Sequence, residues 1–183
     1  MTTRLSRCFL LGSHTLRPHC GAFQGPLDLE YGSAEVVGRI GHTLHPVEAL
    51  SLATHVLEVL RTVQGDDSLS LIRSCWETLL IMPRKELGPA AGADLSLLIV
   101  AEQDSRVALS AVGLDALWQV HSEGAQQLAD PTTNETSHRG LPERTPKVLE
   151  LQAVNQNFLA RCLGDGQKLP PILDPYLPNG SPQ

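Results

Sequence analysis

The fold is decided by residues 94–120, which have the sequence DLSLLIVAEQDSRVALSAVGLDALWQV. Three apolar runs follow one another here, Asp94–Ala101, Arg106–Val112 and Ala116–Val120, and a polar turn separates the first two. Runs of this length that are rich in Leu, Ile and Val are typical of buried strands. The stretch therefore predicts an antiparallel meander whose three strands are adjacent in one sheet.

Two helices are predicted on the amino-terminal side of this meander. The first covers Pro46–Val63, because a proline suits the first turn of a helix. We expect its apolar face to pack across the meander through Leu50, Leu57 and Leu60. The second covers Ser68–Ile81, because two aspartates precede it at the end of a helix where negative charge is favourable.

Short strands and loops account for the rest of the chain. Strands are predicted at residues 5–11, in a hairpin around Gly32-Ser33, and at 148–151 and 158–163, whereas turn-rich segments are predicted at 21–26, 83–92 and 131–146. Five prolines follow residue 168 and exclude regular structure there. The predicted organisation is one domain over residues 1–168 and an extended Pro-rich tail over 169–183.

Composition excludes several classes of protein. The 20 acidic residues outnumber the 14 basic ones, and a net charge of -6 disfavours binding to bare nucleic acid. No apolar run approaches the roughly 18 residues that span a bilayer, so no membrane segment is expected. The amino terminus lacks the pattern of a signal peptide, and the four cysteines are scattered. We expect a cytoplasmic protein with reduced thiols.

Five segments resemble motifs of the metal-dependent type 2C protein phosphatases, the PPM family. They occur in the family's order within about residues 5–168. The segments are RPHCGAF (17–23), VVGRIGH (36–42), EALSLA (48–53), AVGLDALW (111–118) and FLARCLGDG (158–166). They are similar to R-x-x-N-x-D-A-F, V-A-D-G-M-G-G-H, E-x-A-S-x-x-A, V-G-D-S-R-x-Y and F-L-L-L-C-S-D-G, respectively. The resemblance implies an α+β fold in which two antiparallel β-sheets are sandwiched between helix layers.

The resemblance also implies a site for two divalent cations, Mn²⁺ or Mg²⁺, and here the sequence departs from the family. Such hard cations need several converging carboxylate oxygens. Gly21, Val37 and Leu114 occupy the aspartate positions, and Gly38 offers only a backbone carbonyl. Asp165 alone stands at a matching acidic position, and the family's closing D-N motif is absent, which implies a fold truncated at its carboxyl end. We therefore expect no metal and no other cofactor.

The predicted function is that of a catalytically inactive pseudophosphatase, a protein-binding, regulatory or scaffolding module. Without a metal pair, water is a poor nucleophile toward a phosphate monoester. By analogy with the family, the partner would be a protein kinase, its phosphorylated target or a multi-subunit assembly. Two alternatives stay open. One is a weak or altered metal-dependent phosphohydrolase that acts on phosphoserine or phosphothreonine through Asp165, and the other is a purely structural subunit.

Three basic side chains are candidate contacts for a phosphate or a partner. Arg39 lies between Gly38 and Gly41 in the motif segment 36–42, which also contains His42. Arg17 begins the motif segment 17–23. A guanidinium can hold a phosphoryl group by charge-assisted hydrogen bonds. A solvated position on the surface is the alternative for both arginines.

The other reactive side chains give weaker signals. His14, His19 and Cys20 are close in sequence, but a structural zinc site needs four ligands. Cys8 and Cys162 lie in apolar segments, where burial raises the pKa of a thiol and lowers its reactivity. We predict neither a zinc site nor a cysteine nucleophile.

Overall fold

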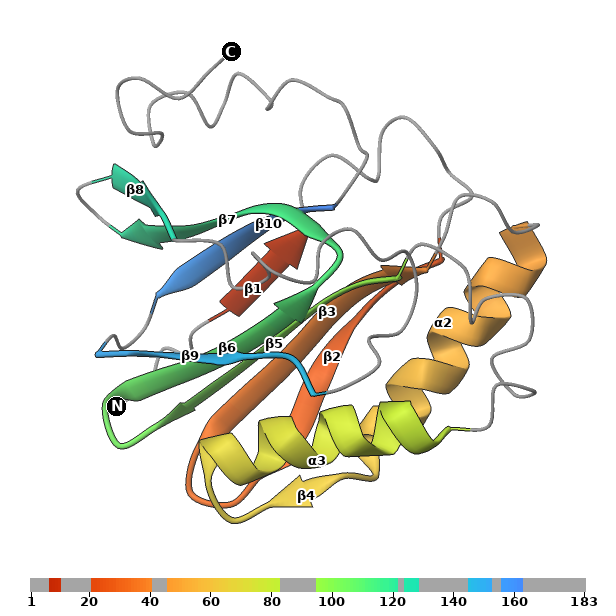
Figure 1. Cartoon of the computed structure of the whole chain (residues 1–183), viewed down its shortest axis with the longest axis horizontal. Helices are drawn as coiled ribbons and strands as arrows, with labels where there is room; N and C mark the ends of the chain where they lie inside the picture. The colour runs from red at the N-terminus through yellow and green to blue at the C-terminus, as the bar shows by residue number, and fades with distance from the viewer. Residues whose placement is uncertain are drawn as a thin grey trace.

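The computed structural model describes residues 7–10, 21–40, 46–82, 95–121, 124–128, 145–152 and 156–162. They form a six-stranded sheet of order β4-β2-β3-β5-β6-β9, a four-stranded sheet of order β1-β10-β7-β8, and two helices (Figure 1). The elements are β1 (Arg7–Leu10), β2 (Gly21–Leu29), β3 (Ser33–Ile40), α2 (Pro46–Arg61), β4 (Gln64–Gly65), α3 (Ser68–Ile81), β5 (Leu95–Gln103), β6 (Arg106–Val112), β7 (Leu114–His121), β8 (Gly124–Gln127), β9 (Val148–Leu151) and β10 (Asn157–Cys162).

Most predicted elements are confirmed where the structure describes them. The strand near the amino terminus, the β2–β3 hairpin, both helices, β9 and β10 all form. The neighbouring strands are antiparallel except for two pairs, β1 with β10 and β2 with β4. The predicted loop at 83–92, most of the loop at 131–146 and the Pro-rich tail lie outside the described residues.

The last strand of the predicted meander lies in the other sheet, so that part of the prediction is wrong. β5 and β6 are antiparallel neighbours as expected, but β7 pairs with β8 and β10 of the four-stranded sheet. The chain changes sheets at Gly113, whose φ of +66° lies in the left-handed region. A Cβ atom there would lie 2.0 Å from the backbone oxygen of Leu95, so the crossing requires glycine.

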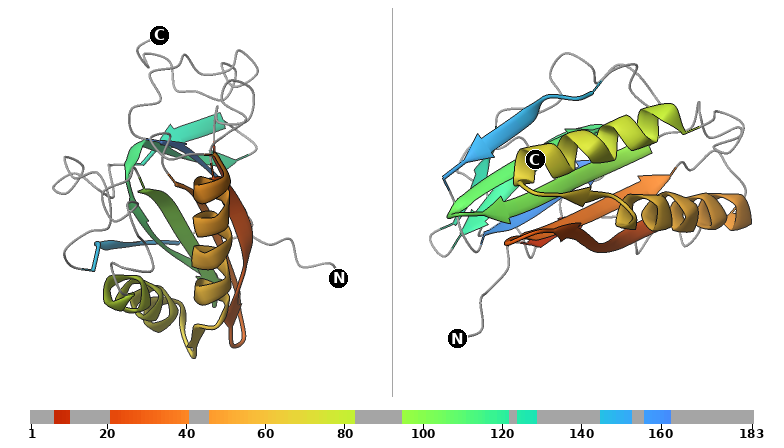
Figure 2. Two further views of the ribbon diagram at one scale, coloured as in Figure 1. Left: turned by 90° about the vertical axis from the view of Figure 1, so that its right-hand side faces the viewer. Right: turned by 90° about the horizontal axis from the view of Figure 1, so that it is seen from below.

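Both helices cover the same face of the six-stranded sheet (Figure 2). α2 packs against β2 and β3, and α3 packs against β5 and β6. The prediction that the first helix crosses the meander is therefore wrong, because α3 lies there. Among the described residues, no helix covers the outer face of the four-stranded sheet, and none is long and apolar enough to cross a membrane.

The buried face of α2 differs from the predicted one. Its buried side chains follow a helical repeat and are Ala49, Ala53, Val56 and Leu60. Leu57 is only partly buried, and Leu50 is 59% exposed, so the predicted packing through Leu50 is wrong. Leu60 belongs to the buried face, as predicted, although that face packs against β2 and β3 and not across the meander. The two alanines allow the helix to lie close to the sheet, and Leu50, about 100° around the helix from Ala49, faces away from it.

Residues 21–26 form the first part of β2, although their glycines and proline predict turns. β2 pairs with β3 from Gly21 to Leu27, and among the described residues its other side is paired only near its end, by β4. An edge strand tolerates Pro26 because one of its two sides needs no ladder hydrogen bond. Gly21 also allows close packing, because a Cβ there would lie 2.2 Å from the backbone oxygen of Ala49 on α2.

The predicted start of α3 is confirmed in detail. The Asp67 side chain accepts hydrogen bonds from the backbone N–H groups of Leu69 and Ser70, and the Ser70 side chain completes a capping box. The hydrogen bond from the Ser70 backbone is the main cause that lowers the pKa of Asp67. This cap fixes the amino-terminal end of the helix.

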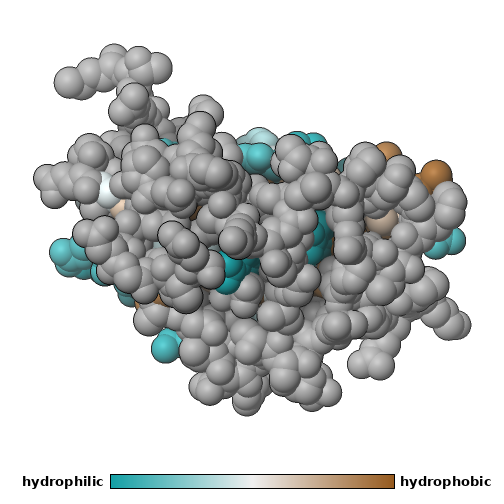
Figure 3. Space-filling view, turned by 90° about the horizontal axis from the view of Figure 1, so that it is seen from above, coloured by the Kyte–Doolittle hydropathy of each residue, from teal (hydrophilic) through white to brown (hydrophobic). Residues whose placement is uncertain are grey.

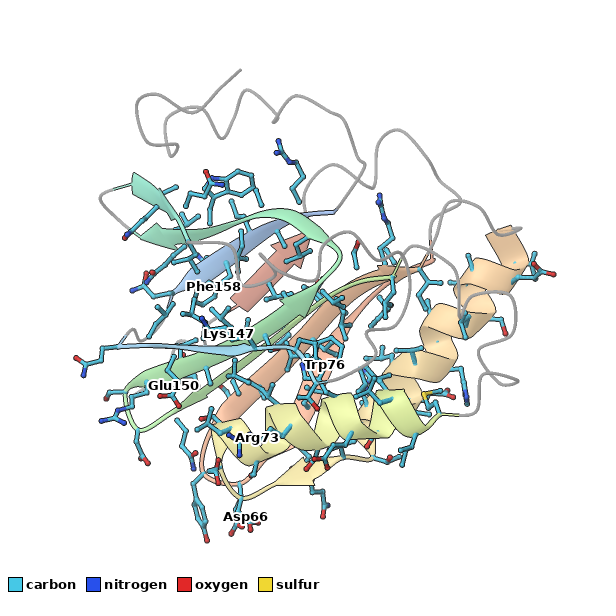
Figure 4. The ribbon with its side chains drawn as sticks, viewed as in Figure 1. Asp66, Arg73, Trp76, Lys147, Glu150 and Phe158 are labelled. Carbon is cyan, nitrogen blue, oxygen red and sulfur yellow. The ribbon has the colours of Figure 1, made fainter. Side chains whose placement is uncertain are left out.

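The six-stranded sheet separates two apolar cores. One lies beneath the helices and contains Trp76, and the other lies between the two sheets and contains Phe158 (Figure 4). The indole N–H of Trp76 donates a 2.9 Å hydrogen bond to the hydroxyl of Ser110 on β6. That hydroxyl in turn donates to the backbone carbonyl of Lys147, just before β9. These two hydrogen bonds connect α3 through β6 to the start of β9, the edge strand of the six-stranded sheet.

Candidate functional site

The candidate site lies where β3 meets the four-stranded sheet. Along β3 the side chains alternate: Val36 and Ile40 belong to the core beneath the helices, whereas Val37 belongs to the core between the sheets. Because strand side chains alternate with a period of two, Arg39 lies on the same inter-sheet face as Val37. We call this end of the inter-sheet layer, around Arg39, the Arg39 site.

The neighbouring strands place small residues beside Arg39. Its register partners are Ala22 on β2 and Ser96 on β5. Ser96 is buried, and its hydroxyl donates a 2.8 Å hydrogen bond to the carbonyl of Gly113, where the chain crosses between sheets. Leu114 follows at once and pairs with the last residue of β10. Strands of both sheets therefore converge on the Arg39 site.

Arg39 brings a positive charge into the protein interior. Its side chain is only 4% exposed, yet a guanidinium stays protonated at any pH at which proteins are folded. A buried charge is costly unless polar groups compensate it. The sequence marks Arg39, which lies between two glycines, as a candidate phosphate contact, and the structure places it inside β3, on the face between the sheets.

Val37 and Leu114 provide the apolar part of the Arg39 site. They are 4% and 2% exposed, and both belong to the apolar cluster between the sheets. Val37 and Leu114 therefore pack in the same apolar layer. Neither side chain has an atom that could bind a cation.

The two glycines assigned to the metal-site motifs lie elsewhere. Gly21 faces α2, on the opposite side of the sheet from Val37, so the structure does not bring these two positions together. Gly38 faces the ring of Phe23, which lies 2.4 Å from the position of an added Cβ. β3 is paired along this stretch by both β2 and β5, so the carbonyl of Gly38 belongs to a sheet ladder.

Several predicted site residues lie outside the described residues. These are Arg17, His42 and Asp165, together with His14, His19 and Cys20. Cys8 belongs to β1 and Cys162 to β10, but their side chains are not among those that the structure describes. Sequence reasoning missed Ala22 and Ser96, the neighbours of Arg39. Val36 and Ile40 are apolar and lie an even number of positions apart, which places them on one face of a strand and Arg39 on the other. This pattern was the signal that could have identified the face on which Arg39 lies.

The described residues do not fit a pair of divalent cations. In the part of the chain that the structure describes, no three His, Cys, Asp or Glu side chains are close enough to hold an ion. The positive charge of Arg39, which lies on the same inter-sheet face as Val37, also disfavours a cation there, because like charges repel. The described residues that line the Arg39 site therefore do not fit the metal pair that the fold family implies.

Cys75 on α3 is a free, buried thiol. It has no exposed surface, and burial raises its pKa from 9.0 to about 12. We expect iodoacetamide to leave Cys75 unmodified in the native protein and to modify it in urea, because the thiolate is the reactive form. Peptide mapping by mass spectrometry separates this cysteine from the others.

The same shift in pKa predicts how stability depends on pH. Below about pH 9 the thiol is neutral in both states, so its contribution is constant. As the pH rises toward 12, the unfolded chain ionises while the folded one does not, and the free energy of unfolding falls. Urea titrations at about pH 8 and about pH 10.5 should show a smaller loss in a Cys75→Ala variant. An equal loss in both proteins would contradict the prediction.

Comparisons with known proteins agree on the fold. No protein-family model matches the sequence, and no curated protein matches it. Among solved structures, the chain is similar to the RsbU and RsbW domains of Rv1364c from Mycobacterium tuberculosis, with a TM-score of 0.54 and 14% identity over 80% of this chain. It is also similar to the SiaA-PP2C domain of Pseudomonas aeruginosa, with a TM-score of 0.50 and 12% identity over 76% of this chain.

A third similar structure is a bacterial serine phosphatase, with a TM-score of 0.50 and 13% identity over 77% of this chain. The chain spans 39% of the Mycobacterium tuberculosis structure, 54% of the Pseudomonas aeruginosa domain and 67% of the serine phosphatase. The protein has a PPM-type phosphatase-like fold, in a form shorter than these chains. The resemblance drawn from the sequence is thus confirmed at the level of the fold.

Proposed function

We propose that this domain is a catalytically inactive phosphatase-like module that acts by binding another protein. The buried guanidinium of Arg39, beside Val37 and Leu114, is the observation that carries the proposal. Phosphate-monoester hydrolysis is among the slowest uncatalysed reactions, and the fold family accelerates it with metal-activated water. A site with a fixed positive charge and apolar neighbours supplies no such water.

The partner that we propose is a protein kinase, its phosphorylated target or a larger assembly. One similar structure carries an RsbW domain beside its RsbU domain on a single chain, so this fold also occurs next to another protein domain. Arg17 and His42 are proposed to contribute to partner contacts. The acidic net charge of -6 favours partner surfaces that are basic.

Metal addition tests the inactivity. We expect Mn²⁺ to produce no turnover of p-nitrophenyl phosphate or of a phosphoserine peptide, under conditions in which an active type 2C phosphatase hydrolyses both. Calorimetric titration with Mn²⁺ should detect no pair of bound ions, and EDTA should leave the melting temperature unchanged. Micromolar binding of two ions, Mn²⁺-dependent turnover, or a melting temperature that falls by many degrees in EDTA would overturn the proposal.

A further inference from the structure

The outer face of α2 exposes apolar side chains that the sequence assigns to the core. Val47 is 68% exposed and Leu50 59% exposed. Together with Ser51, Thr54, His55 and Glu58 they line an open hollow of about 570 Å³, which we call the α2 hollow. In Figure 3, apolar surface is visible at the right-hand end, the side on which Figure 1 shows α2.

Two polar residues of the α2 hollow, Ser51 and Thr54, are small, so another chain can lie close to the helix there. Thr54 directs its hydroxyl inward, since its Oγ1 donates a 2.9 Å hydrogen bond to the carbonyl of Leu50 on its own helix. Ser51 is small, so a second backbone can lie close to the helix here. Residues 47–58 extend over about 16 Å at 1.5 Å per residue, a length that a helix of three turns matches.

The charge of the α2 hollow is negative. Glu58 is the one Asp, Glu, Lys or Arg side chain among its lining residues, and exposed Glu48 follows Val47 at the other end. Arg61 does not neutralise the hollow, because its guanidinium lies over Gly25 on β2, 2.6 Å from the position of an added Cβ. The complementary surface is therefore apolar with basic residues beside it.

We propose that the α2 hollow binds an amphipathic, basic helix of another protein. Its apolar side chains pack against Val47 and Leu50, and a Lys or Arg on the same helix pairs with Glu58. Ridges of two helices interlock at axis separations of 8–10 Å, which the small side chains at 51 and 54 permit. This inference rests on the proposed function as a binding module and assigns its surface.

Two designed helical peptides of roughly 15 residues test this inference. Both carry Leu at positions i, i+3, i+4 and i+7, and they differ only in having Lys or Glu beside the Leu face. Fluorescence anisotropy of the labelled peptides with the full chain measures their affinities. We expect the Lys peptide to bind at least tenfold more tightly than the Glu peptide, and its affinity to fall as salt is added.

Variants locate the binding surface. Leu50→Ser should weaken the Lys peptide at least tenfold, and Glu58→Lys should reverse the preference between the two peptides. The controls are on α3: Ile81→Ser removes an apolar side chain that is even more exposed than Leu50, and Glu77→Lys makes the same change of charge as Glu58→Lys. Neither control should change either affinity by more than about twofold, or about 0.4 kcal/mol. All four substitutions are at exposed positions, and circular dichroism checks that each variant is folded.

Three results would overturn the inference. One is equal binding of the two peptides, and another is a loss of binding in Ile81→Ser as large as in Leu50→Ser. The third is a dimer of the free protein in sedimentation equilibrium that Leu50→Ser dissociates, because the hollow would then belong to a second copy. The proposed function fails differently, through Mn²⁺-dependent hydrolysis, and that result would leave the peptide measurements intact.

Discussion

The double variant Val37→Asp/Leu114→Asp is expected to be less stable than Val37→Asn/Leu114→Asn by about 3–5 kcal/mol at neutral pH. Both positions are buried in the apolar layer between the sheets. Two carboxylates in this apolar layer would be buried charges, which are costly unless polar groups compensate them. The variant does not include a change at Gly21, because that position faces α2 and not the layer between the sheets. Urea denaturation of the two variants measures the difference, and the asparagines control for lost volume.

Two further measurements separate charge from packing. The aspartate–asparagine difference should shrink as the pH falls toward about 4, because a buried carboxyl with a raised pKa becomes neutral. Mn²⁺ should not rescue Val37→Asp/Leu114→Asp while Arg39 is present, but it should raise the melting temperature once Arg39→Met is added. Rescue by Mn²⁺ with Arg39 intact would show that the guanidinium does not exclude cations.

Trp76→Ala is expected to lower the free energy of unfolding by about 3–5 kcal/mol. The side chain has no exposed surface, fills the core beneath the helices and donates to Ser110. Trp76→Phe keeps part of the volume and loses the hydrogen bond, so it should cost less than Trp76→Ala. Ser110→Ala should cost about 1–3 kcal/mol, because it leaves the buried indole N–H of Trp76 without its acceptor. Urea titration gives all three values.

A loss below about 1 kcal/mol for Trp76→Ala would contradict this picture, since that is the size of an average substitution. It would mean that α3 can move inward and refill the space. Thr54→Ala on the exposed face of α2 is a suitable reference and should change stability by at most about 0.5 kcal/mol.

The sequence predicted best the elements whose signals are local. α3 begins where two aspartates precede an apolar repeat, and its cap forms at Asp67 as expected. The β2–β3 hairpin also forms, and its signal is the Gly32-Ser33 pair between two strand-like segments. In both cases the residues that decide the structure lie within a few positions of one another, so no distant contact needs to be known.

The sequence did not predict features that depend on distant contacts. The three apolar runs at 94–120 do not say which sheet each strand joins, and that depends on the approach of Gly113 to Leu95. Leu50 fits the apolar stripe of α2, but the close contact of Gly21 with Ala49 turns it outward. Packing between elements decided both outcomes.

At the candidate site, matching motifs along the sequence did not predict which side chains share a face of the sheet, because the strand register was not known. The match of residues 36–42 to a metal-binding motif directs attention to Val37 and does not show which way the side chain of Arg39 faces. The strand alternation shows that both side chains face the same layer, and the register adds Ala22 and Ser96 beside Arg39. The same alternation places Gly21 on the other face, which no spacing along the chain could reveal.

The pairing of β1 with β10 has a consequence for how the protein is made. These strands are neighbours although about 150 residues separate Arg7 from Asn157. On the ribosome, the β2–β3 hairpin and the two helices emerge long before β10, so β1 must wait without its partner. Closing so long a loop costs entropy before any contact repays it, and contacts of high sequence separation slow folding. The four-stranded sheet should therefore be the last part to become protected from hydrogen exchange during synthesis.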